Sequence, residues 1–153
     1  MSGSVRGCAV AAAVAVCAVL AGPLASAQAS NATLRATVNS YNSRIRHDEA
    51  RVLDGLSAYK NHHPAPLIRA IRHEVRDLNA LKRQLAGESG STARGRAAKS
   101  DIIQGVGLIA SAYVALERDV QAPSGFRPVS LAKVRAKVIR GRAKLLAGLK
   151  LLA

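Results

Sequence analysis

Apolar side chains recur every three or four residues from about residue 31 to the end of the chain, and three clusters of turn-forming residues interrupt the pattern. This period places the apolar residues of each stretch on one face of an α-helix. No stretch between turn signals shows the alternation with period two that indicates a strand. The pattern predicts four helices, at about 31–60, 65–86, 91–120 and 130–152.

The three turn clusters, at 61–66, 87–90 and 121–128, contain prolines or glycines and are short. Short connections between long helices make consecutive helices antiparallel neighbours. We therefore expect an all-α fold, an antiparallel up-down-up-down four-helix bundle, with residues 28–153 as its single domain.

Residues 1–27 have the pattern of a secretory signal peptide. Arg6 precedes an uninterrupted run of small apolar residues that is shorter than the roughly 20 residues of a membrane-spanning helix. Gly22 and Pro23 end the run, and Ala25-Ser26-Ala27 matches a cleavage site. We expect cleavage after Ala27 and a secreted, extracellular or periplasmic cell-envelope protein.

Both cysteines, Cys8 and Cys17, lie within this leader, so the mature chain offers neither a disulfide nor a thiolate site. The leader also removes one basic residue and no acid. The remaining 22 basic and 9 acidic residues give residues 28–153 a net charge of +13.

The charge is concentrated in the last helix, because residues 121–153 hold eight basic side chains and no acidic one. A basic amphipathic helix either packs on a core or lies on an anionic surface. The charge fits an anionic polymer, an anionic membrane surface or an acidic protein as partner. The leader argues against intracellular nucleic acid. The residues that we expect to contact anions are Lys133, Arg135, Lys137, Arg140 and Lys144.

Polar residues interrupt two of the apolar stripes. Asp48 and Glu49 lie between Ile45 and Val52, and Arg142 occupies the stripe of the last helix. If the first and last helices are antiparallel, these residues lie at similar heights. We hypothesise a buried polar layer in which Arg142 pairs with Asp48 or Glu49, since an unpaired buried charge costs several kcal/mol. A pair at the rim that reaches solvent is the alternative.

Gly105 and Gly107 lie inside the third predicted helix, where each glycine costs about 1 kcal/mol relative to alanine. Close approach of a neighbouring helix is the simplest reason for their presence. No strand precedes them and no Lys-Ser or Lys-Thr follows, so they do not form a phosphate-binding loop.

No motif indicates an enzyme. The sequence has no Glu-x-x-His pair for a di-metal bundle, no mature cysteine nucleophile and no Gly-x-Ser-x-Gly. We expect no catalytic, cofactor or metal site. The charge instead favours a non-enzymatic module that binds anionic envelope or extracellular polymers. A structural or protein-interaction bundle without an anionic ligand is the alternative. A membrane-active protein that acts through its basic C-terminal helix is the third possibility.

Overall fold

A computed structural model of the chain describes the backbone of residues 7–60, 63–122 and 128–153 and the side chains of residues 30–59, 63–122 and 130–153. Four α-helices account for nearly all of it: α1 (Gly7–Lys60), α2 (Pro64–Gly87), α3 (Ala93–Gln121) and α4 (Pro128–Leu151). No residue in the described ranges forms a strand, and the prediction of an all-α fold is confirmed.

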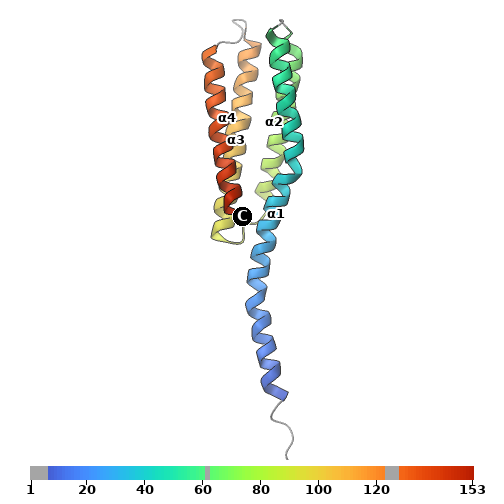
Figure 1. The fold of residues 1–153 in the computed structure, drawn as a ribbon, viewed down its shortest axis with the longest axis vertical. Coiled ribbons are helices and arrows are strands. Elements are labelled where there is room, and N and C mark those ends of the chain that lie inside the picture. The colour runs from blue at the N-terminus through green and yellow to red at the C-terminus, as the bar shows by residue number, and fades with distance from the viewer. Residues whose placement is uncertain (1–6, 61–62, 123–127) are drawn as a thin grey trace, which may run out of the picture.

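Consecutive helices run in opposite directions and lie side by side as a bundle, with the first part of α1 extending beyond it (Figure 1). None of these helices, within the described residues, is both long and apolar enough to cross a membrane. Three of the four helices begin and end within two residues of the positions predicted from the apolar period.

The first helix differs from its predicted boundary, because α1 begins at Gly7 rather than near residue 31. The predicted cleavage point after Ala27 therefore lies within this helix, and the side chains of residues 1–29 lie outside the described part. Ser30 is already helical and does not act as an N-cap. Its hydroxyl donates a hydrogen bond to the carbonyl of Ser89 and accepts one from the N–H of Ser91, which joins α1 to the turn between α2 and α3.

Local signals explain where the other helices start. Pro64 and Pro66 stand in the first turn of α2, where the missing N–H of proline removes no intrahelical bond. Thr92 precedes α3 in an extended conformation, and its hydroxyl accepts a hydrogen bond of 2.8 Å from the N–H of Gly95. This is an N-cap, which satisfies one of the free donors at a helix start.

The core consists of apolar side chains from all four helices, with α3 contributing the most. The buried side chains of the described residues lie at positions 34–152. The largest fully buried apolar side chains are Leu34, Leu67, Ile71, Leu78, Leu81, Leu85, Ile102, Val106 and Leu116.

Helices α3 and α4 pack at very close range through glycine. A Cβ atom at Gly105 would lie 2.6 Å from the carbonyl oxygen of Gly141, and one at Gly148 would lie 2.7 Å from the carbonyl oxygen of Ala98. Real Cβ atoms do not approach backbone this closely, so these positions exclude any larger residue. The expected close approach holds for Gly105. It does not hold for Gly107, whose Cβ would meet only the end of the Lys82 side chain at 4.0 Å.

The edge between α1 and α4 is more open than the other edges of the bundle. Backbone packing joins α1 to α2, α2 to α3 and α3 to α4, but α1 and α4 do not pack along their backbones. A groove of about 430 Å³ lies between them. Its walls are largely apolar and come from Val52, Leu53, Leu56, Tyr113, Leu116, Leu131, Val134, Val138 and Ile139, with Glu49, Arg135 and Arg142 at its polar positions.

Candidate functional site

Four of the five basic residues predicted to contact anions share one side of α4. Lys133, Lys137, Arg140 and Lys144 follow one another at spacings of four, three and four residues, which places them on one face of a helix. This face is beside α3 rather than α1. We call these four residues the basic row.

The basic row meets acidic residues of α3 at two places. The ammonium group of Lys144 lies 3.1 Å from a carboxylate oxygen of Asp101. Lys133 and Lys137 line a shallow depression of about 310 Å³ together with Asp119 and Ser130. Part of the charge of the row is therefore offset within the protein.

Arg135, the fifth predicted residue, lies on the other side of α4. It lines the groove between α1 and α4 with Arg142, which is seven residues further along the helix. The five residues thus do not form one cluster. A helical face holds positions separated by three, four or seven residues, and Arg135 stands two residues from both Lys133 and Lys137.

Arg142 and Glu49 form the ion pair expected between the last and first helices. The guanidinium Nη2 lies 2.5 Å from the Glu49 carboxylate, and this hydrogen bond is the main reason that the pKa of Arg142 is raised. The Arg142 side chain is 55% exposed, so the pair lies at the rim of the groove and not in the interior. The reason is the open edge, which leaves the guanidinium in contact with solvent.

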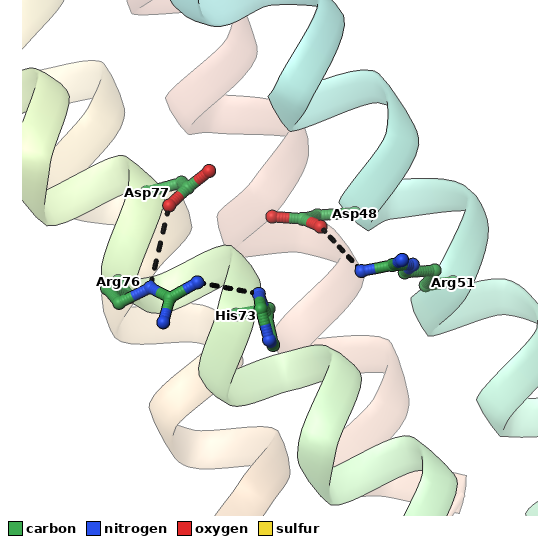
Figure 2. Close-up of polar contacts among 5 residues, drawn as sticks. All are labelled: Asp48, Arg51, His73, Arg76 and Asp77. Atoms are coloured by element: carbon green, nitrogen blue, oxygen red, sulfur yellow. Dashed lines mark hydrogen bonds and ion pairs between the residues drawn. The ribbon is translucent and has the colours of Figure 1, made fainter.

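Asp48 is the member of the predicted layer that is buried. Asp48 is only 4% exposed, and its side chain points from α1 toward α2 (Figure 2). Its nearest basic partner is Arg51, at 3.8 Å, and its second carboxylate oxygen has no hydrogen-bond partner. On α2, Arg76 contacts both the ring of His73, at 2.8 Å, and the carboxylate of Asp77, at 3.7 Å. The polar layer therefore runs from the rim into the contact between α1 and α2.

Glu74 is the most deeply placed polar residue of the layer, and the sequence analysis did not identify it. It lies on α2, is 0% exposed, and neither of its carboxylate oxygens has a hydrogen-bond partner. Burial is the main cause that raises its pKa from 4.5 to about 8, and the nearby charges of Glu49, Asp48 and Asp77 contribute to the same shift. Arg142 opposes this shift only weakly, so Glu74 holds a proton at neutral pH.

Tyr113 of α3 completes the layer, so that each of the four helices contributes a polar side chain to it. Its pKa is raised above the ordinary range, mainly by burial and then by the charges of Glu74 and Glu49. A signal for Glu74 does exist in the sequence. The buried positions 67, 71, 74, 78, 81 and 85 of α2 follow a repeat of four and three residues, and Glu74 occupies one of them.

Within the described ranges, no three Asp, Glu, His or Cys side chains are grouped so that they would hold a metal ion. His47, His63 and His73 are exposed, and His62 lies outside the described residues. What the layer does hold is a protonated carboxyl group surrounded by carboxylates, which makes it a structural element that responds to pH.

No protein-family model matches the chain, and neither the curated proteins nor the solved structures include a significant match.

Proposed function

We propose that residues 28–153 form a secreted, non-enzymatic module that binds anionic polymers of the cell envelope or the extracellular space. The predicted leader at 1–27 supports secretion to an extracellular or periplasmic location. The observation that carries the binding function is the basic row, four cationic side chains on one side of a helix that has no acid.

The geometry suits a repeating anion better than a single small ligand. At a rise of about 1.5 Å per residue, the basic row extends over roughly 17 Å along α4. Its cationic groups are on long, flexible stems on a convex helix surface, which follows the charges of a polymer without requiring one sequence or shape. Such contacts neutralise anions and release counterions, so their affinity falls steeply with salt.

A structural or protein-interaction bundle without an anionic ligand is the second candidate, and the pair between Lys144 and Asp101 favours it. That pair shows that one charge of the basic row has a partner within the protein. In this case the charge of α4 keeps the surface solvated. Any affinity for polyanions then depends on the net charge of the protein and not on which basic residues carry it.

Heparin binding by matched charge variants separates the two candidates. We would compare Lys133→Gln/Lys137→Gln with Arg69→Gln/Arg83→Gln, a control pair of exposed arginines on α2 with the same loss of charge. The proposal predicts at least a tenfold loss of heparin affinity for the α4 pair and little change for the control, because contact charges contribute far more than distant ones. Equal losses in both variants, or no binding by the unaltered protein, would contradict it.

A further inference from the structure

The outward side of α4, opposite the face that packs on α3, is apolar from residue 132 to residue 147 and ends at the exposed Lys150. Four alanines on it are exposed, at positions 132, 136, 143 and 147. Ile139 and Leu146, which lie beside them, are each 57% exposed, and Leu131 is 38% exposed. Only one other large apolar side chain of the described residues is exposed, Leu53 of α1, which lies across the groove. Three of the four exposed large apolar side chains of the described residues are thus on α4.

Basic side chains border this apolar strip on both of its long edges. The basic row runs along the edge beside α3, and Arg135 and Arg142 run along the edge beside the groove. The helix carries no acidic residue. An apolar strip between two lines of lysine and arginine is the arrangement of a helix that lies in a membrane interface, since the stems extend sideways and place their charges at the headgroups.

We propose that the protein docks on anionic lipid bilayers through the outward side of α4, with Ile139 and Leu146 inserted at the headgroup boundary. This inference goes beyond the proposed function, because it uses the same basic row but adds a lipid surface as a further anionic partner. In the docked state α4 keeps its close contact with α3, because the glycine-mediated face and the docking face lie on opposite sides of the helix.

The exposed apolar side chains distinguish a bilayer from a soluble polyanion. A polyanion offers partners for the basic row but gives no reason for isoleucine and leucine to face solvent between two lines of cations. A bilayer provides both the anionic headgroups and an apolar layer below them. A second copy of this chain is a poor occupant, since its own α4 carries the same unbalanced positive charge.

Vesicle sedimentation tests this docking. The probe is a vesicle of equal parts phosphatidylglycerol and phosphatidylcholine at low salt, and pure phosphatidylcholine vesicles are the control. The protein is the full chain, with the chain from Gln28 measured alongside, and the helical fold of both is checked by circular dichroism. We expect binding to the anionic vesicles, little binding to the neutral ones, and loss of binding as salt rises.

Two pairs of substitutions separate the apolar and the charged contributions. Ile139→Ser/Leu146→Ser is expected to weaken vesicle binding by about tenfold or more and to leave heparin binding unchanged, since these side chains contribute burial but no charge. Lys133→Gln/Lys137→Gln is expected to weaken vesicle binding by roughly 25-fold, about fivefold for each charge near the surface. The α2 control pair, Arg69→Gln/Arg83→Gln, is expected to bind within about threefold of the unaltered chain, since its charges lie away from the docking face.

The outcomes distinguish this inference from the proposed function. Heparin binding without vesicle binding would overturn bilayer docking and leave the polymer-binding module standing. Vesicle binding that survives Ile139→Ser/Leu146→Ser unchanged would also overturn it, because the contact would then be purely electrostatic. Binding to neither probe would contradict both.

Discussion

Glu74 gives the bundle a dependence on pH that is opposite to that of most proteins. Its carboxyl is fully buried without a hydrogen-bond partner and has a pKa of about 8 in the folded chain, compared with 4.5 when it is exposed by unfolding. The folded state therefore keeps this proton up to about pH 8, while the unfolded state releases it above pH 4.5. Unfolding releases a proton between these values, so rising pH favours the unfolded state.

The size of the effect follows from the two pKa values. The stabilising contribution of the protonated Glu74 is fully present below pH 4.5 and is lost as pH rises to about 8. Each pH unit in this window removes up to about 1.4 kcal/mol from the free energy of unfolding, so the change from pH 5 to pH 7 is roughly 2.5 kcal/mol. That is a large share of the 5–15 kcal/mol that typically stabilises a domain.

Urea unfolding followed by circular dichroism, at pH values from 4 to 9, measures this effect in the unaltered chain and in Glu74→Gln. The glutamine is a neutral isostere, so the two proteins should have similar stability near pH 4. By pH 7 the variant should be more stable by about 3 kcal/mol, because only the unaltered chain titrates at this position. Subtracting one curve from the other removes the titration of all other groups. Parallel curves across the whole range would refute the buried, protonated state of Glu74.

Three further substitutions test the packing and the polar layer. In urea unfolding, Gly105→Ala should destabilise the fold by several kcal/mol, since its Cβ would meet the α4 backbone, whereas Gly107→Ala should stabilise it by up to about 1 kcal/mol. Two losses of equal size would show that α3 and α4 are not in close contact at Gly105. Arg142→Leu should change stability by less than about 1 kcal/mol, because its ion pair is half-exposed; a drop of several kcal/mol in urea unfolding would place the pair in the interior. Asp48→Asn should lower the pKa of Glu74 by removing a nearby negative charge, which moves the upper end of the pH-dependent window to lower pH. An unmoved window would show that Asp48 does not act on Glu74.

The sequence predicts the helices well because their boundaries depend on local signals. The prolines at 64 and 66 and the cap at Thr92 mark helix starts by the same rules in any fold. The helix α1 of the full chain begins at Gly7 rather than near residue 31, because the predicted leader is also helical and the Gly22-Pro23 pair does not interrupt it.

The contacts between helices were harder to predict. Small residues recur every seven positions on α3, at 98, 105 and 112, and again on α4, at 141 and 148. This repeat coincides with the close contact of α3 with α4. A search for large apolar residues does not find it, because it consists of alanine and glycine, whose small size is what allows two helices to approach closely. The gap between α1 and α4 depends on how the other three pairs of neighbouring helices pack. The apolar stripe of one helix gives no information about the packing of the other helices.

The candidate site was predicted only in part. The pairing of Arg142 with Glu49 follows from antiparallel helices and opposite charges, and the structure contains it. Glu74 was not predicted as a core residue because its neighbour Val75 also fits an apolar period of three or four. The apolar pattern alone therefore selects Val75, although Glu74 is the buried residue. Arg135 stands two residues from Lys133 and Lys137, and residues two apart point to different sides of a helix. The sequence spacing is therefore sufficient to predict that Arg135 lies away from the basic row.

The most direct test of the proposed function is the salt dependence of heparin binding by the chain from Gln28. If the basic row makes the contact, the slope of log affinity against log salt concentration should be steep. Lys133→Gln/Lys137→Gln should reduce that slope by about two, one for each lost contact, while Arg69→Gln/Arg83→Gln leaves it unchanged. A slope that is the same in all three proteins would show that the basic row of α4 does not bind the polymer.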